Sequence, residues 1–262
     1  MTTLTRQDGN TDLWRTVFAD GHPVLVTKQK RYRMLPSDPR CKLCEMPFGG
    51  VGGWFFRQRG LKASDRNPHY CTTCDGFLEA FPGGAEVPMS MMMVDIRDSV
   101  ALSGQISPTD FARLVMALRD DMARILDQTD GFLLEFQGDS VFAVWPPGFV
   151  GPSHAQKALR AAELAQQMFA SRKDRKAAPV GVAVHTGPVY IGTVSGAGGR
   201  LQGISAFGLE VNILARLAAA ARPGEVLVSA AAYAAANTPM PVGHHRSEVL
   251  KGVDHPVEVA VL

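Results

Sequence analysis

Residues 134–145 read LEFQGDSVFAVW, in which two apolar, alternating runs flank a Gly-Asp pair. Such a pair between alternating runs is a common signal of a tight hairpin turn. The stretch therefore predicts two antiparallel strands, and it places the carboxylates of Glu135 and Asp139 on either side of a polar turn. A plain hairpin needs neither carboxylate, so any functional interpretation depends on what surrounds it.

The segments around the hairpin alternate between strand and helix patterns. EVPMSMMMVDI (86–96) predicts a buried strand, and residues 107–131 predict an amphipathic helix with Ser107 as its cap and Pro108 at its first position. Further along, the patterns predict a helix over 153–172, two β segments within 178–196, a helix over 208–224, a strand over 224–230, and short strands around LKGV (250–253) and VEVAVL (257–262). The order β-α-β-β-α-β predicts an α/β fold, an α+β sandwich with helices packed on a mixed or antiparallel sheet.

The composition and the breaks along the chain suggest a two-part, cytoplasmic protein. With 262 residues, 46% of them hydrophobic and 20% charged, the chain is long enough for one full domain and a small accessory one. FPGGAEVP (81–88) predicts a boundary near residue 84, which gives an N-terminal module over 1–84 and a larger domain over 85–262. The start lacks a signal-peptide pattern, and no apolar run approaches about 18 residues, so we expect no membrane contact.

The charge distribution indicates little about partners. Residues 1–85 hold 12 Lys/Arg against 8 Asp/Glu, and the remainder holds 15 against 17. The basic run KQKRYR (28–33) is too short to predict a nucleic-acid partner, because such runs are more often solvated chain.

The four cysteines form one pattern, Cys41-x2-Cys44-x26-Cys71-x2-Cys74. Two Cys-x2-Cys pairs can supply four thiolates in a tetrahedron, the geometry of a structural zinc site. An iron centre or an iron–sulfur cluster is the alternative, and disulfides or free thiols fit a chain without an export signal less well. Because the glycine-rich spacer is too irregular to build a core, metal ligation would supply much of this module's folding free energy.

One predicted helix presents two polar side chains together. In GLEVNILAR (208–216), Asn212 and Arg216 are four residues apart, so they share a face, whereas Val211, Leu214 and Ala215 fall on the other side. The pattern fits a helix that packs on a core and presents an amide and a guanidinium to a cleft.

From about residue 90 onward the chain resembles the catalytic domain of the class III adenylate/guanylate cyclases. The resemblance rests on five blocks in order: VDIRDS (94–99), FQGDSVFAVW (136–145), VAVHTGPVYIG (182–192), GLEVNILAR (208–216) and LKG (250–252). It implies the ferredoxin-like β-α-β-β-α-β cyclase fold and an enzyme that converts a purine nucleoside triphosphate into its 3′,5′-cyclic monophosphate and pyrophosphate.

The resemblance also implies a catalytic site with two Mg²⁺ or Mn²⁺ ions. In the family these ions activate the ribose 3′-hydroxyl and hold the leaving phosphates, chemistry that suits carboxylate ligands. The matching ligands here are Asp95 and Asp139, assisted by the carbonyl of Ile96. Backbone N–H groups at Arg97, Asp98 and Ser99 would bind phosphate, although the family usually has glycine at the position of Asp98.

Similarity assigns roles to the remaining polar residues. Asn212 would orient the ribose, Arg216 would offset charge that develops on the α-phosphate, and Lys251 would bind the terminal phosphate. The family's two purine-reading positions are occupied by Glu135 and Ser205. A carboxylate can accept hydrogen bonds from guanine N1–H and its amine, and a serine can donate to O6, so GTP is favoured over ATP.

In this family the site is completed by a second chain. The resemblance implies a head-to-tail homodimer, in which the acidic half-site of one chain faces the base- and phosphate-reading residues of the other. The alternative function is a cyclase-like nucleotide-binding signalling module with little turnover, controlled by the metal or redox state of the N-terminal part.

Overall fold

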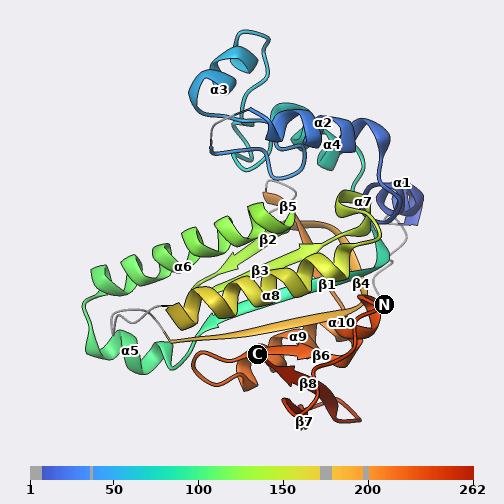
Figure 1. Cartoon of the computed structure of the whole chain (residues 1–262). Helices are drawn as coiled ribbons and strands as arrows, with labels where there is room; N and C mark the ends of the chain where they lie inside the picture. Colours follow the sequence, from blue (N-terminus) through green and yellow to red (C-terminus); the bar gives the residue numbers. More distant parts are fainter. Residues whose placement is uncertain (1–7, 36–37, 172–178, 197–200) are drawn as a thin grey trace. The chain divides into compact units, whose positions relative to one another are not determined.

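The computed structural model describes residues 8–35, 38–171, 179–196 and 201–262, and it divides the chain into two compact units (Figure 1). The first unit comprises Met1–Val87 together with Tyr190–Ala206, and the second comprises Pro88–Val189 together with Phe207–Leu262. Residues 190–206 therefore group with the N-terminal module, although their sequence follows the strand pattern of the larger domain.

The described strands and helices of the larger domain alternate along the chain. The strands are β1 (Gly84–Ile96), β2 (Phe132–Gln137), β3 (Ser140–Trp145), β4 (Val180–Gly196), β5 (Leu201–Phe207), β6 (Val226–Ser229), β7 (His245–Glu248) and β8 (Val257–Val261). The helices are α5 (Ser99–Gln105), α6 (Pro108–Thr129), α7 (Pro147–Val150), α8 (His154–Ser171), α9 (Leu209–Ala220) and α10 (Ala230–Ala235). This is the mixed α+β architecture that the sequence predicts.

The strands form one mixed sheet. Among the described residues its order is β2-β3-β1-β4-β6-β8-β7, with β5 paired to β4. β3 lies antiparallel to both β1 and β2, whereas β4 and β6 run parallel. The β1–β3 register pairs Asp95 with Ser140, so the end of β1 lies beside the turn of the β2–β3 hairpin.

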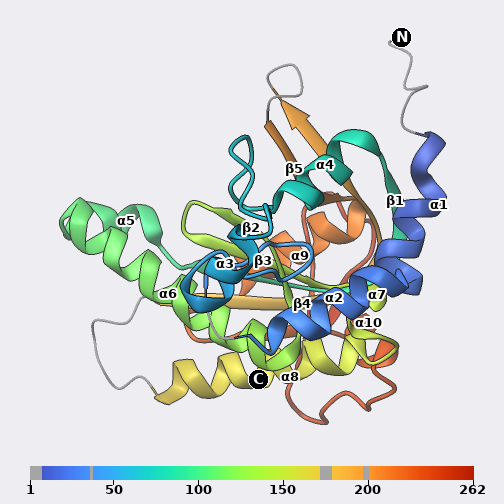
Figure 2. The same cartoon turned by 90° about the horizontal axis from the view of Figure 1, so that it is seen from above.

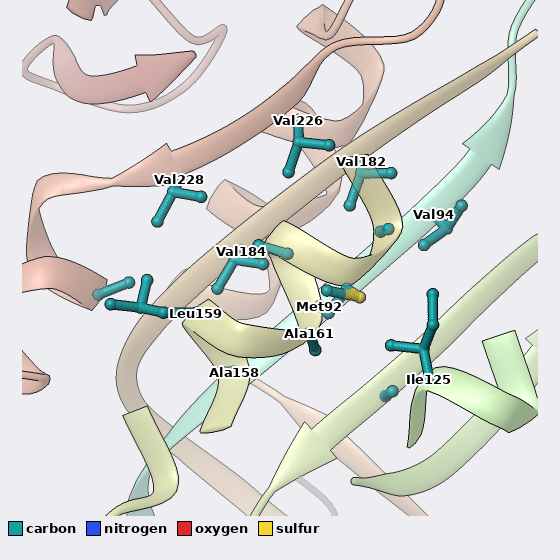
Figure 3. Packing of buried hydrophobic residues seen from close by; sticks show 14 of the residues in the cluster. Met92, Val94, Ile125, Ala158, Leu159, Ala161, Val182, Val184, Val226 and Val228 are labelled. Carbon is teal, nitrogen blue, oxygen red and sulfur yellow. The ribbon is translucent and has the colours of Figure 1, made fainter. Parts of the chain in front are cut away.

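One face of this sheet is covered by α6 and α8, which lie side by side in both views (Figures 1 and 2). Alternate residues of the strands point into the core beneath them, including Met92, Val94, Val182 and Val184 (Figure 3). The inner face of α8 is built largely from alanines, which lets the helix approach the sheet closely. The amphipathic pattern of the sequence thus accounts for this half of the core.

Helix α9 packs on the opposite face. Gly181 alternates with the inward-facing Val180 and Val182, and a Cβ at Gly181 would lie only 3.0 Å from the backbone oxygen of Ala218 in α9. The absent side chain therefore allows α9 to contact the strand backbone directly. This contact positions the helix that carries Asn212 and Arg216.

Most predicted elements are present, and the exceptions have physical reasons. The predicted cap of the long helix is confirmed, since the Asp110 N–H donates to Ser107 Oγ at 3.1 Å. The strand predicted around LKGV is wrong, because those residues form a turn closed by a hydrogen bond from the Val253 N–H to the Leu250 carbonyl, and β7 pairs with β8 instead. The two β segments predicted within 178–196 are a single strand, β4.

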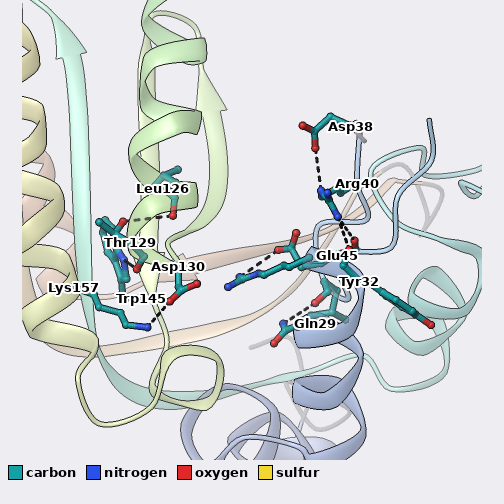
Figure 4. A network of polar contacts seen from close by, with 12 residues as sticks. Gln29, Tyr32, Asp38, Arg40, Glu45, Leu126, Thr129, Asp130, Trp145 and Lys157 are labelled. Atoms are coloured by element: carbon teal, nitrogen blue, oxygen red, sulfur yellow. Dashed lines mark hydrogen bonds and ion pairs between the residues drawn. The ribbon is translucent and has the colours of Figure 1, made fainter. Parts of the chain in front are cut away.

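The N-terminal residues contribute short helices rather than a sheet. They are η1 (Asp8–Asn10), α1 (Thr11–Arg15), η2 (Thr16–Asp20), α2 (Pro23–Arg33), α3 (Gly50–Arg57) and α4 (Thr72–Ala80). Polar contacts tie α2 to the first cysteine pair: Gln29 Nε2 donates to the Leu43 carbonyl at 2.9 Å, and Arg40 Nη1 donates to the Tyr32 carbonyl at 2.9 Å (Figure 4). These hydrogen bonds hold the segment that contains Cys41 and Cys44 against α2.

Candidate functional site

Two carboxylates meet where β1 ends and the β2–β3 hairpin turns. Gly138 has φ +60°, the left-handed region that glycine adopts without strain, so the turn needs only two residues, Gly138 and Asp139. Because Asp95 pairs with Ser140 across the sheet, the hairpin brings Asp139 beside Asp95. The structure therefore brings together the two side chains predicted to hold divalent cations.

The electrostatics of this pair favour a cation. The pKa of Asp95 is raised by burial and by the negative charge of Asp139, while Arg97 and the Ile96 N–H act in the opposite direction. Asp139 Oδ2 is buried and has no hydrogen-bond partner among the described residues. A buried carboxylate oxygen without a partner is costly unless a cation neutralises it. The donor set therefore fits Mg²⁺ or Mn²⁺.

Arg97 connects this acidic pair to α9. Its guanidinium forms an ion pair with Asp95, and Nη1 donates to the carbonyl of Ala219 at 2.8 Å. The Arg97 side chain is only 12% exposed, so these contacts are largely shielded from water. In the structure the guanidinium supplies positive charge to Asp95, and a bound cation would compete with it.

The loop after Asp95 differs in one respect from its predicted role. The backbone N–H of Arg97 donates to the Pro179 carbonyl at 2.7 Å, so phosphate binding would fall to the N–H groups of Asp98 and Ser99. Asp98 has φ +52°, in the left-handed region of backbone conformation that glycine adopts without strain. Aspartate is one of the few other residues that tolerate this region. Its side chain is exposed rather than buried against the loop.

Helix α9 presents the two polar residues as predicted. Asn212 and Arg216 are exposed, and the helix buries Ile213, Leu214, Leu217 and Ala218 on its other side. Arg216 Nη2 lies 3.9 Å from the position that a Cβ on Gly252 would take. The guanidinium is thus close to the turn whose backbone carries Lys251.

A buried polar contact that the sequence did not reveal fixes the start of α9. His185 on β4 contacts Glu210 through Nε2 at 2.5 Å and Ser229 through Nδ1 at 2.8 Å. A Cβ on Gly187 would meet the Glu210 side chain at 2.6 Å, so the Gly187 position leaves room for that carboxylate. The signal available in the sequence is an acidic residue in the first turn of a helix, which is too common to identify a buried partner.

We expect Glu210→Ala to destabilise the protein by about 1–3 kcal/mol, because it leaves a buried histidine nitrogen without its partner. Glu210→Gln keeps a hydrogen-bonding group of the same size and should lose less. Urea unfolding of both variants measures the difference, and equal stabilities of Glu210→Ala and the parent chain would contradict it.

The two predicted purine-reading residues lie in different units. Glu135 is half-buried on β2, at the edge of the sheet, where Gln137 Nε2 donates to its Oε2 at 2.6 Å. A bulge in the β2–β3 pairing lies between Leu133 and Glu135. Ser205 is in β5, 7% exposed, within the first unit.

The four cysteines converge in the N-terminal unit. All are free and buried, and their sulfurs lie within 4.8 Å of one another. The Cys44 and Cys71 sulfurs are 3.7 Å apart, which matches the edge of about 3.8 Å expected for a tetrahedron with 2.3 Å metal–sulfur bonds. The distance is far too long for a disulfide, whose sulfurs lie about 2.05 Å apart.

Backbone donors and crowding around the sulfurs also fit a metal site. The Cys71 N–H donates to Cys41 Sγ at 3.2 Å, and the Cys74 N–H donates to Cys71 Sγ at 3.4 Å at the start of α4. The hydrogen bond with Cys41 is the largest influence on two pKa values: it raises that of Cys74 and lowers that of Cys71. In the thiolate form that binds a metal, four sulfurs this close together would need a cation to balance their charge.

Among the helices that the structure describes, none combines the length and the apolar character needed to cross a bilayer.

Comparison with known proteins points to one family. The family model described as the adenylate and guanylate cyclase catalytic domain matches residues 85–258. Adenylate cyclase 1 of Rhizobium meliloti (strain 1021) is 32% identical over 135 residues, which are 49% of this chain and 20% of that protein. Adenylate cyclase of Anabaena cylindrica is 27% identical over 139 residues, 49% of this chain and 26% of that protein.

The chain thus spans only a fifth to a quarter of these relatives. Among solved structures, the guanylyl cyclase Cya2 superposes with a TM-score of 0.58 at 21% identity, covering 68% of this chain and 93% of that one. At this level of identity the superposition shows a shared fold. The mixed α+β fold is therefore that of the solved cyclase domains.

Proposed function

The chain belongs to the adenylate and guanylate cyclase catalytic domain family, and from this premise we propose that it converts a purine nucleoside triphosphate to its 3′,5′-cyclic monophosphate and pyrophosphate. The observation that carries the proposal is the pair Asp95 and Asp139, held side by side, with one buried carboxylate oxygen that has no partner in the part of the chain that the structure describes. Two Mg²⁺ or Mn²⁺ ions held there, with help from the Ile96 carbonyl, would lower the pKa of the ribose 3′-hydroxyl and bind the leaving phosphates.

The chain's own residues have separate tasks in this proposal. Arg216 places a guanidinium where negative charge develops on the α-phosphate, and Asn212, on the same exposed helix face, orients the ribose. Lys251 binds the terminal phosphate. The closeness of Arg216 to the Gly252 turn supports a shared phosphate-binding role for Arg216 and Lys251.

The first test is a cyclase assay on purified protein with Mn²⁺ or Mg²⁺ and either GTP or ATP. Cyclic product should form with at least one nucleotide and should disappear when a chelator removes the divalent ion. Absence of product with both nucleotides and both metals would contradict the proposal.

We further propose that GTP is the preferred substrate. The named relatives are adenylate cyclases and the superposed structure is a guanylyl cyclase, so the proposed preference rests on side-chain chemistry. Glu135 already accepts a hydrogen bond from Gln137 and could accept equally from guanine N1–H and the exocyclic amine. Adenine offers no such pair of donors on that edge.

Glu135→Lys should therefore move the preference towards ATP. A charged hydrogen bond is worth about 1.5–3 kcal/mol, so the GTP-to-ATP ratio of kcat/KM should fall about 10- to 100-fold. Glu163→Lys on the exposed side of α8 makes the same charge change away from the hairpin and serves as the control. An unchanged ratio in Glu135→Lys would remove this residue from base recognition.

We propose that the working form is a head-to-tail homodimer. In it, Asp95 and Asp139 of one chain face Asn212, Arg216 and Lys251 of the other, and each dimer contains two equivalent sites. The proposal rests on family membership and on the presence of both kinds of half-site in one chain.

We also propose that the N-terminal module, residues 1–84, holds one zinc ion on Cys41, Cys44, Cys71 and Cys74. The sulfur spacing supports a single tetrahedral ion, whereas a four-iron cluster, with each thiolate on a different iron, would need the sulfurs farther apart. A single iron would adopt the same geometry, so elemental analysis and the visible spectrum of the purified protein distinguish the two metals.

One observation favours a second candidate function. Because Arg97 pairs with Asp95 and an aspartate occupies the usual glycine position of the phosphate loop, the chain could bind nucleotide and signal with little turnover. Saturable nucleotide binding without detectable cyclic product would select this function over the first.

A further inference from the structure

We propose that Tyr70 is a positioning residue that links the four-cysteine site to strand β5, so that metal bound at the cysteines sets the position of the base-reading Ser205. The effect on base recognition rests on the proposed function, whereas the link between the cysteine site and β5 does not. The starting observation is that residues 190–206 form a compact unit with residues 1–87. The hairpin arm that contains Ser205 thus belongs to the same unit as the cysteines.

The backbone of Tyr70 is fixed by the cysteine site. Tyr70 directly precedes Cys71, whose N–H donates to Cys41 Sγ at 3.2 Å. The Ser64 N–H donates to the Tyr70 carbonyl at 2.8 Å, and the Tyr70 N–H donates to the Asn67 carbonyl at 3.0 Å. Any change in the placement of Cys71 must therefore move the Tyr70 backbone with it.

The Tyr70 side chain contacts β5. It is 3% exposed, and its hydroxyl oxygen accepts a hydrogen bond from the backbone N–H of Ile204. Ile204 directly precedes Ser205, and both are buried. A single buried hydrogen bond therefore joins a residue next to a metal ligand with a residue next to the predicted base reader. Loss of such a bond leaves a buried polar group unpaired, which is unfavourable.

The other arm of the hairpin is held without the cysteines. The Thr193 N–H donates to the Gly83 carbonyl at 2.7 Å, and the Gly83 N–H donates to Thr193 Oγ1 at 2.8 Å. A Cβ on Gly84 would lie 2.5 Å from the Tyr190 ring, so this junction is closely packed. With β4 tethered at Gly83, loss of the metal should loosen β5 selectively rather than release the whole hairpin.

The consequence for function is a metal-dependent change in base recognition. Metal ligation contributes folding free energy to the segments that carry the cysteines, so its loss should release Tyr70 from its fixed position. The catalytic carboxylates Asp95 and Asp139 lie in the other unit and are not part of this linkage. KM and the GTP-to-ATP ratio should therefore change more than kcat with the preferred nucleotide.

The test is amide hydrogen exchange over residues 201–207, followed by mass spectrometry, in the full chain. Tyr70→Phe removes only the hydroxyl and should raise exchange in this segment about fivefold with the metal content unchanged. Tyr32→Phe is the matched control, because its ring lies in the same module and packs on Phe56. Removal of the metal from the parent chain should raise exchange in the same segment, and the rise should be smaller in Tyr70→Phe.

Equal exchange in the parent chain, Tyr70→Phe and metal-free protein would overturn the linkage. This readout needs no turnover, so it separates failure of the linkage from failure of the cyclase proposal. In an active enzyme, Tyr70→Phe should also raise KM for GTP about fivefold with kcat nearly unchanged. A loss confined to kcat would contradict a positioning role in base recognition.

Discussion

Asp139→Asn should reduce turnover of both GTP and ATP by at least about a thousandfold while leaving the fold intact. The substitution preserves the shape of the side chain and removes the negative charge that a divalent cation requires. It also replaces a buried carboxylate oxygen, which has no partner among the described residues, with part of a neutral amide, so unfolding in urea should occur at the same or a higher denaturant concentration. Loss of activity together with unchanged or improved stability would show that Asp139 serves to bind metal and that its buried charge lowers the stability of the fold.

The measurements are kcat with Mn²⁺, Mn²⁺ binding, and urea unfolding of the same preparation. Asp120→Asn, an exposed carboxylate on α6, is the matched control and should behave as the parent chain. If Asp139→Asn retained parental turnover, the acidic pair would not be the catalytic metal site. A large loss of stability would instead indicate that Asp139 serves the hairpin.

Local patterns were sufficient to predict the elements that form the core. The Gly-Asp turn, the cap at Ser107 and the apolar spacing of the long helix each depend on neighbours within a few residues. The same is true of the cysteine spacing and of the shared exposure of Asn212 and Arg216. Where a motif is local, the residues that form it also determine its geometry.

The contacts that the sequence did not predict join distant segments. Arg97 reaches Ala219 across 122 residues, and His185 reaches Glu210 on a different element. Neither contact corresponds to a periodic pattern or a fixed residue spacing that could be recognised in a single sequence. The association of residues 190–206 with the cysteine module also joins distant segments. Strand β4 is continuous, yet its residues from Tyr190 onward belong to the unit that contains the cysteines.

Two individually inactive variants should recover activity when they are combined. In the proposed dimer each site takes Asp139 from one chain and Arg216 from the other. A dimer of one Asp139→Asn chain and one Arg216→Ala chain therefore contains one doubly defective site and one intact site. With random pairing half of the dimers are mixed, so co-expression should restore about a quarter of the parental activity.

The control for this experiment pairs two defects from the same half-site. Asp95→Asn combined with Asp139→Asn gives no dimer with an intact site, because each mixed dimer places one altered carboxylate in each acidic pair. Differently tagged chains, purified together, establish that mixed dimers are present in both samples. Recovery in the first combination and none in the second requires that each site be shared between two chains. Without recovery in verified mixed dimers, the acidic pair and Arg216 would have to act within a single chain.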